Sequence, residues 1–243
     1  MGQIAFLTQL ISISESKNSV LFVFDIDSTL YNVSPRNIEI IKDYAQANVQ
    51  NLNPTLQSAL MSVTHHYTDW GIKTPLLRLN LLNPDMELLK NIKKHWNQFF
   101  FSGKFLHHDE EYPGAVNFVN QLSKHAPTFY LTGRDVQRMG SETLEQLSQS
   151  GFPTDPHHNK LILKPNKEML DHEYKLEELK KLALDFDAIY FFENEPIILN
   201  EVVTHFSEDK VIPICIASTH SGRAEINPKI KTIQPDYRLK EDL

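Results

Sequence analysis

Cysteine is almost missing from this sequence. One cysteine, Cys215, stands among 243 residues, so the chain has no disulfide framework and no multi-cysteine zinc site. Basic residues are outnumbered: 24 lysines and arginines face 31 aspartates and glutamates, a formal net charge of −7. This acidic balance argues against general binding to nucleic acid or to anionic membranes, because both favour a basic surface.

Long hydrophobic runs are also missing. The most apolar stretches, residues 188–192 and 211–217, are far shorter than the roughly 20 residues that span a bilayer. The first ten residues lack the positive charge and the long apolar core of a secretory signal. We therefore expect a cytoplasmic protein that does not bind membranes. The motifs GxxxxGK, GxGxxG and HExxH do not occur, so nucleotide-loop, dinucleotide-binding and zincin functions lack support.

What the sequence does contain is the composition of a globular protein, with 41% hydrophobic and 23% charged residues. Its length fits one large domain, or one domain with an insertion. Five apolar runs are predicted to be strands: 20–24, 128–131, 160–163, 188–192 and 211–217. Helical spacings lie between the later runs, over 115–122, 136–147 and 174–184. This alternation predicts an α/β fold with a doubly wound parallel sheet.

The helical spacing over 136–147 predicts which side of that helix is buried. Val136, Met139, Leu144 and Leu147 are predicted to form its buried stripe. Gly151 follows at the position where a helix commonly ends.

Residues 34–108 interrupt the alternation of strands and helices. Three predicted helix starts there share a capping side chain followed by proline: Ser34-Pro35, Asn53-Pro54 and Asn83-Pro84. Apolar residues at helical spacing follow each start, and no run resembles a strand. We therefore predict an all-helical cap domain over 34–108, inserted into a core made of residues 1–33 and 109–243.

Polar residues stand where the predicted strands end. Asp25 and Asp27 follow the first strand, Thr132 follows the second, and Glu193 follows the fourth. Ligands of open parallel sheets bind at this edge. Two carboxylates beside a buried strand need a cation or a proton as compensation, and Mg²⁺ prefers such oxygen ligands. Lys175, predicted near a helix start, and the Thr132 hydroxyl could hold phosphate oxygens.

Four of these segments carry a family resemblance. Residues 24–30, with the sequence FDIDSTL, resemble the first motif of the haloacid dehalogenase-like (HAD) hydrolase superfamily. Residues 130–134, the region of Lys175, and residues 192–195 are similar to its second, third and fourth motifs, in the same order. The resemblance spans about residues 19–217. It implies a HAD-like Rossmannoid core whose helical insertion occupies the position of a C1-type cap.

The resemblance also implies roles for single residues. Asp25 is expected to be the nucleophile that forms an aspartyl-phosphate, and Asp27 the general acid and base. The Thr132 hydroxyl and the Gly133 backbone N–H are expected to bind the phosphoryl oxygens. Lys175 is expected to offset the negative charge of the phosphate and of Asp25.

The third motif has a second candidate. Lys164 is the alternative phosphate lysine, and Lys175 is preferred because Asp171 is a plausible N-cap that places it in an early helical turn. Arg134 could contact substrate or pair with a carboxylate.

The resemblance implies Mg²⁺ as cofactor, held by Asp25, the Asp27 backbone carbonyl and Glu193. The fourth motif departs from the family pattern, because glutamate stands where the family commonly has aspartate and Asn194 follows it. Glu195 is an alternative ligand. A weakened metal site would follow if the longer glutamate side chain shifts the ion.

We therefore expect a Mg²⁺-dependent phosphoric monoester hydrolase of the HAD-like phosphatase type that acts on a small phosphorylated metabolite. The helical cap favours a small substrate, and the acidic charge argues against a nucleic-acid 3′-phosphatase. Two alternatives stay open: a phosphotransferase or phosphomutase, and a catalytically weak HAD-like protein that acts as a binding or regulatory module. The sequence does not name the substrate or the oligomeric state.

Overall fold

The computed structural model describes residues 2–16, 19–79 and 86–242. Two compact units divide the chain. The core unit comprises Met1–Tyr31 and Glu111–Leu243, and the helical unit comprises Asn32–Glu110. The helical unit extends two residues beyond the predicted insertion at both ends. The chain passes between the units at β2 (Tyr31–Asn32) and β3 (Glu110–Glu111), which form a two-stranded sheet.

The core unit is built on a parallel sheet of six strands in the order β5-β4-β1-β6-β7-β8. The strand bounds are β1 Val20–Phe24, β4 Thr128–Asp135, β5 Leu161–Lys164, β6 Ala188–Glu193, β7 Val211–Ile216 and β8 Lys231–Ile233. The predicted doubly wound α/β fold is thus confirmed. The first strand matches its prediction, and β4 runs past its predicted end at residue 131. The edge strand β8 was not predicted, because Ile233 is its one buried residue.

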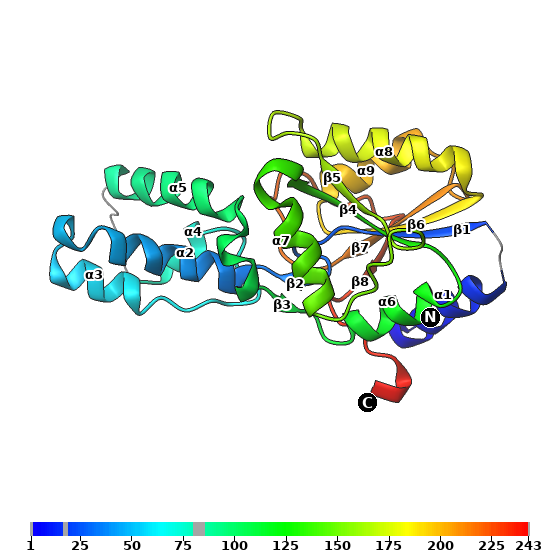
Figure 1. Cartoon of the computed structure of the whole chain (residues 1–243), viewed down its shortest axis with the longest axis horizontal. Coiled ribbons are helices and arrows are strands. Elements are labelled where there is room, and N and C mark those ends of the chain that lie inside the picture. The colour runs from blue at the N-terminus through cyan, green and yellow to red at the C-terminus, as the bar shows by residue number, and fades with distance from the viewer. Residues whose placement is uncertain (1, 17–18, 80–85, 243) are drawn as a thin grey trace. The chain divides into compact units, whose positions relative to one another are not determined.

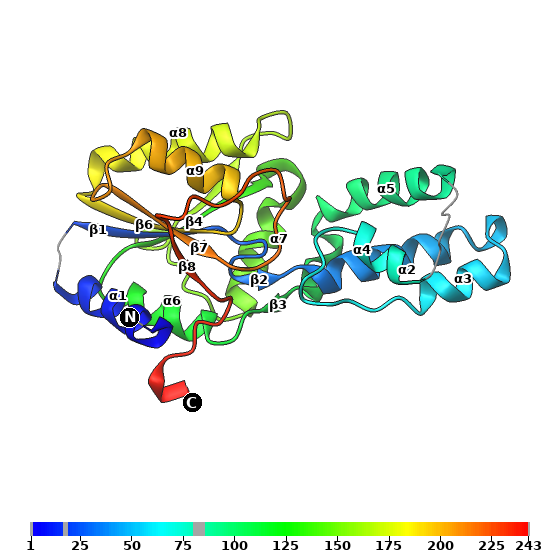
Figure 2. The ribbon, with the colours of Figure 1, turned by 180° about the vertical axis from the view of Figure 1, so that it is seen from behind.

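Helices cover both faces of this sheet (Figures 1 and 2). One face carries α1 (Gln3–Ser16), α6 (Ala115–Ser123) and α7 (Val136–Gln149), and the other carries α8 (Asp171–Asp185) and α9 (Pro196–His205). Side chains alternate along a strand, so β1 supplies both cores. Phe22 and Phe24 pack towards α6, whereas Leu21 and Val23 pack towards α8 and α9. A short helix, η3 (Lys240–Asp242), lies near the end of the chain.

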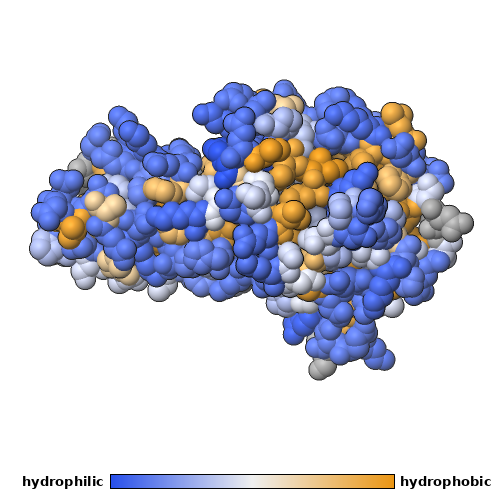
Figure 3. All heavy atoms as spheres, viewed as in Figure 1, coloured by the Kyte–Doolittle hydropathy of each residue, from blue (hydrophilic) through white to orange (hydrophobic). Residues whose placement is uncertain are grey.

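The predicted buried stripe of α7 is half wrong. Met139 and Leu147 are fully buried, but Val136 is 55% exposed and Leu144 is 46% exposed. The buried face of α7 instead includes two polar residues, Thr143 and Gln146. Figure 3 shows apolar side chains gathered on the surface around β5 and α7. The predicted end of the helix is confirmed, because Gly151 has a φ of 85° just after the C-cap residue.

The helical unit has its own apolar core. Its helices are α2 (Ser34–Ala47), η1 (Val49–Asn51), α3 (Pro54–Met61), α4 (Lys73–Arg78), α5 (Met86–Phe100) and η2 (Gly103–His108). Among the described residues of this unit, its core contains eight buried residues: Ile38, Ile41, Tyr44, Ala45, Leu60, Val63, Leu76 and Ile92. No helix among the described residues is long and apolar enough to cross a membrane.

The three predicted helix starts have different outcomes. The Asn53 side chain accepts a hydrogen bond from Leu56 N at 2.8 Å, so this cap is confirmed. The Ser34 cap is wrong: α2 already includes Ser34, and Val33 is the N-cap residue. Asn32, two residues earlier, supplies the acceptor for the Ser34 N–H. The Asn83-Pro84 start lies outside the described residues.

Candidate active site

The site begins where β1 ends. The backbone N–H of Asp25 donates to Phe192 O of β6 at 2.9 Å, so the residue is fixed between two strands. Its side chain is almost fully buried. The chain then turns sharply: Ser28 has a φ of 60°, and its N–H donates to Tyr31 O at 2.8 Å. This loop leaves Asp27 partly exposed, with 26% of its side chain accessible.

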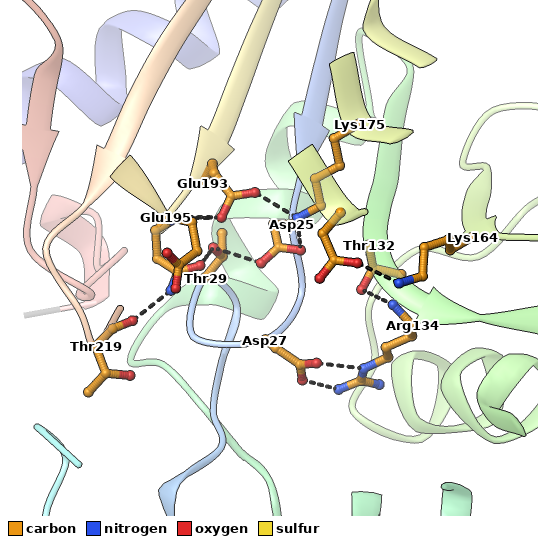
Figure 4. A network of polar contacts seen from close by, with 12 residues as sticks. Asp25, Asp27, Thr29, Thr132, Arg134, Lys164, Lys175, Glu193, Glu195 and Thr219 are labelled. Atoms are coloured by element: carbon orange, nitrogen blue, oxygen red, sulfur yellow. Dashed lines mark hydrogen bonds and ion pairs between the residues drawn. The ribbon is translucent and has the colours of Figure 1, made fainter. Parts of the chain in front are cut away.

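Lys175 joins two of the predicted site residues. Its ammonium lies 2.6 Å from Asp25 Oδ1 and 2.6 Å from Glu193 Oε2. Figure 4 shows Lys175 reaching towards both carboxylates. The three residues come from α8, β1 and β6 and are all buried. The structure therefore brings Lys175 to the nucleophile candidate from 150 residues away. Sequence spacing alone could not establish this contact.

The reason given for preferring Lys175 is wrong in detail. Leu170 is the N-cap residue of α8, and Asp171 is the first residue inside the helix with no capping hydrogen bond. Asp171 instead accepts a hydrogen bond from Lys164, whose Nζ lies 2.5 Å from Asp171 Oδ1 and 3.1 Å from Met169 O. Lys164 is thus held at the end of β5, in an ion pair that does not include Asp25.

The charges at the end of β1 do not balance. Two buried carboxylates share one ammonium, a net charge of −1 when all three are ionised. Burial, followed by repulsion from Glu193, raises the pKa of Asp25 to about 8, although Lys175 opposes this. Burial alone would lower the pKa of Lys175, but attraction to Asp25 and Glu193 raises it above its ordinary value. Lys175 is therefore charged, and the cluster accommodates a proton or an additional cation.

Glu193 is fixed by neighbours on both of its oxygens. Oε1 accepts the backbone N–H groups of Asn194 at 2.8 Å and of Glu195 at 3.0 Å, while Oε2 faces Lys175. The Glu195 carboxylate is engaged elsewhere, since Ser221 donates to it through N and Oγ at 2.7 Å each. The residue predicted as the alternative ligand is therefore held by the loop after β7.

Oxygen acceptors outnumber donors beside Asp25. The Thr29 hydroxyl lies 3.3 Å from Asp25 Oδ2 and 3.4 Å from Asn194 Oδ1, and its single proton can serve one of them at a time. The Asn194 amide is oriented by donating to Thr219 O at 2.6 Å. Among the described residues, no three His, Cys, Asp or Glu side chains form a ready metal cluster. An excess of oxygens with few carboxylates nevertheless fits Mg²⁺, which keeps water ligands and needs few carboxylates.

Arg134 pairs with Asp27 at the end of β4. Its Nη2 lies 2.6 Å from Asp27 Oδ1 and its Nε lies 3.3 Å from Oδ2. The backbone N–H of Arg134 also donates to the Thr132 hydroxyl oxygen at 3.3 Å. Of the two possibilities for Arg134, the structure thus contains the carboxylate pair. Thr132 is buried and lies at the same edge of the sheet as Asp25 (Figure 4).

Gly133 lies against a carboxylate. A Cβ at this position would be 2.8 Å from the Asp171 carboxyl group, so no larger residue fits without a shift. The predicted phosphate-binding N–H therefore belongs to a closely packed segment. The pairing of β4 with β5 shifts register between Thr132 and Asp135 around this segment.

Four contributing residues were missed in the sequence. Thr29 stands within the first motif, but no role was predicted for its hydroxyl. Thr219 follows β7 and orients Asn194. Thr143 and Gln146 hold Arg134 from α7 at 3.3 and 2.7 Å. Polar residues on the buried face of a helix were the available signal, but the predicted stripe placed Leu144 there instead.

Comparison with known proteins gives the fold. The sequence matches no protein-family profile and no curated protein. Solved structures do match. A HAD-superfamily hydrolase from Ehrlichia chaffeensis aligns with a TM-score of 0.50 and 13% identity, over 89% of this chain and 92% of that one.

Two further structures extend the comparison. A predicted phosphoglycolate phosphatase from Haemophilus somnus aligns with a TM-score of 0.52 and 13% identity, over 89% and 94% of the two chains. The protein YfnB from Bacillus subtilis, described as a HAD-hydrolase bound to magnesium, aligns with a TM-score of 0.50 and 11% identity, over 93% and 97%. This chain therefore has the fold of the HAD-like hydrolases and phosphatases, as the four motifs indicated.

Proposed function

We propose that this protein is a phosphoric monoester hydrolase that uses Mg²⁺ and passes through a phosphorylated Asp25. The observation that carries the proposal is the buried Asp25–Lys175–Glu193 cluster at the carboxyl end of β1, with Asp27 two residues further on. Phosphoryl transfer depends mainly on positioning and charge neutralisation. A fixed carboxylate beside a permanent ammonium supplies both.

In the first half of the reaction, Asp25 forms a bond to phosphorus while the bond to the leaving oxygen breaks. Asp27 gives its proton to the departing alkoxide. In the second half, Asp27 takes a proton from water, the water oxygen bonds to phosphorus, and the Asp25–phosphorus bond breaks. Lys175, the Thr132 hydroxyl and the Gly133 N–H hold the phosphoryl oxygens and offset their charge.

The residues that would hold Mg²⁺ are Asp25, the Asp27 backbone carbonyl and Glu193, with the Asn194 amide oxygen as a further candidate. The bound ion would neutralise charge on the phosphoryl oxygens as a Lewis acid. With Asp25 ionised, as its role of nucleophile requires, the cluster carries a net charge of −1, so a phosphate dianion added without a cation would meet repulsion. A small phosphorylated metabolite is the proposed substrate class.

The test is phosphate release from 4-nitrophenyl phosphate, with and without Mg²⁺. We expect turnover by the wild type with Mg²⁺, and none by Asp25→Asn, which keeps the shape of the side chain but removes its charge. Asp185→Asn, an exposed residue at the end of α8, is the control and should keep full activity. Activity that survives in Asp25→Asn would refute the aspartyl-phosphate route.

The two alternatives give different results in the same preparation. A phosphotransferase or phosphomutase would move labelled phosphate to an added alcohol or sugar phosphate faster than to water. A binding or regulatory module would bind Mg²⁺ with beryllofluoride, a phosphoryl mimic, or a phosphorylated ligand, yet release no phosphate from a panel of phosphometabolites. Salt-sensitive binding to single-stranded DNA would favour a nucleic-acid substrate instead.

A further inference from the structure

Arg134 is one of the most deeply buried charged residues of the core unit. It stands near the end of β4 and is 2% exposed. Two of its guanidinium nitrogens face the two oxygens of Asp27, at 2.6 and 3.3 Å. This two-point geometry fixes the plane of a carboxylate as well as its position, which a single hydrogen bond does not do.

The other side of the guanidinium is held by α7. Its Nη1 donates to Gln146 Oε1 at 2.7 Å and lies 3.3 Å from Thr143 Oγ1. Both residues are on the buried face of the helix, where the apolar pattern predicted leucine. The guanidinium thus links a rigid helix to the loop that carries Asp27. An arginine engaged on both sides is anchored, not free to turn towards a substrate.

Asp27 needs such an anchor. It lies after the buried strand, and its side chain is 26% exposed, so packing alone does not fix its rotamer. A group that transfers a proton must stay within hydrogen-bond reach of the reacting oxygen, and a displacement of about 1 Å can cost roughly a hundredfold in rate. A carboxylate has about four acceptor sites, and the two hydrogen bonds from Arg134 use two of them.

We propose that Arg134 is a positioning residue that orients the Asp27 carboxyl group for proton transfer, with Thr143 and Gln146 holding the guanidinium in place. The proposal rests on the proposed function and deepens it. Arg134 acts through Asp27, so its loss should matter only where proton transfer matters. Protonation of the leaving group is essential for an alkyl phosphate and dispensable for 2,4-dinitrophenyl phosphate, whose leaving group is already stable as an anion.

The experiment compares kcat and KM on these two esters for wild type, Arg134→Lys, Asp27→Asn and the double variant. For Arg134→Lys we expect kcat/KM on the alkyl phosphate to fall by about 10- to 100-fold, with at most a small change in kcat/KM on the dinitrophenyl ester. This ratio reports the transfer to Asp25 and excludes the later hydrolysis of the phosphoaspartate, which also uses Asp27 and is common to both esters. The double variant should be no slower than Asp27→Asn, because both changes remove the same function. Gln146→Leu, which removes one acceptor from Arg134, should show the same pattern more weakly.

Arg138→Lys is the matched control. Arg138 lies in the first turn of α7, four residues after Arg134, and forms an ion pair with Asp135, so this change should leave both esters unaffected. Thermal unfolding of every variant shows whether the core unit is intact, and Gln146→Leu tests the proposal even if Arg134→Lys does not fold.

Three results would overturn the proposal. Equal losses of kcat/KM on both esters, with KM unchanged, would indicate a general structural role. A raised KM on both esters with kcat preserved would indicate that Arg134 contacts substrate. Independent, multiplying losses in the double variant would show that Arg134 does not act through Asp27. A wild type inactive on both esters would contradict the proposed function, and this inference with it.

Discussion

Replacing Lys175 by methionine should strongly destabilise the core unit. The change keeps the length of the side chain but leaves the carboxylates of Asp25 and Glu193 buried without their shared cation. Their facing oxygens can be no more than about 5 Å apart, because each lies 2.6 Å from the same nitrogen. At an effective dielectric constant of about 20, two unit charges at that distance repel by roughly 3 kcal/mol.

The two carboxylates repel each other with or without Lys175, so what the variant loses is the cation that offsets this repulsion. Removing one partner of a buried ion pair typically costs about 3–5 kcal/mol. Uptake of a proton limits the cost, since the pKa of Asp25 is already about 8 with Lys175 in place. We expect a loss of about 3 kcal/mol in the free energy of unfolding in metal-free buffer at neutral pH. Adding Glu193→Gln should recover part of it, because one carboxylate then remains.

The assay is equilibrium unfolding in urea followed by two probes. Both tryptophans of the chain, Trp70 and Trp96, lie in the helical unit, so their fluorescence follows that unit alone. Far-UV circular dichroism follows both units. The Lys175→Met change should lower the midpoint of the core unit's transition, which dichroism detects and tryptophan fluorescence does not. Two-state analysis applies to each transition separately.

A matched control comes from the same helix. Lys180 of α8 forms an exposed ion pair with Glu177 at 2.7 Å, and Lys180→Met should not move either transition measurably. The reasoning would be refuted if Lys175→Met changed the core transition by less than about 1 kcal/mol, the range of surface ion pairs. Equal shifts in both variants would refute it as well.

Three smaller predictions concern other parts of the chain. Asn53→Ala removes the cap of α3 and should cost about 1 kcal/mol, measured by tryptophan fluorescence in urea. Although burial opposes it, hydrogen bonds from Arg78 and from the His66 N–H lower the pKa of Asp69. The ionised Asp69 therefore stabilises the helical unit above the unfolded-state pKa of about 3.9, and this stabilisation is lost as pH falls through the lower folded-state pKa. Asp69→Asn should remove this acid dependence of the unfolding transition followed by fluorescence. Gly114 has a φ of 76°, and an added Cβ would lie 2.5 Å from Arg238 N, so Gly114→Ala should release the C-terminal segment to protease, with Gly2→Ala unaffected.

Local patterns predicted most of the elements of the core unit. Five consecutive apolar residues predicted β1, because a strand buried on both faces has no polar side to alternate with. The Asn53 cap was predictable because it is local: the side-chain oxygen accepts from a backbone N–H only three residues away. The edge strand β8 escaped prediction, since two of its three residues face solvent and carry no apolar signal.

The parts of α7 that were mispredicted show the limit of such patterns. Apolar spacing placed Leu144 in the core, but the tertiary structure buries Thr143 and Gln146 there. They are stable in that position because Arg134 gives them charged hydrogen-bond donors. The burial of Thr143 and Gln146 is thus set by Arg134, a residue on β4. No periodicity within the helix contains that information.

The sequence by itself determined which residue types stand at the ends of the strands, and thereby the fold class and the candidate residues Asp25, Asp27, Thr132 and Glu193. It could not tell which of Lys164 and Lys175 lies beside Asp25, because both are lysines near an element boundary. The order of the strands decided it: β1 lies between β4 and β6, which brings Asp25 and Glu193 together where α8 supplies Lys175. Ion pairs form between groups that the sheet brings within a few ångströms, and that proximity exists only in the folded chain.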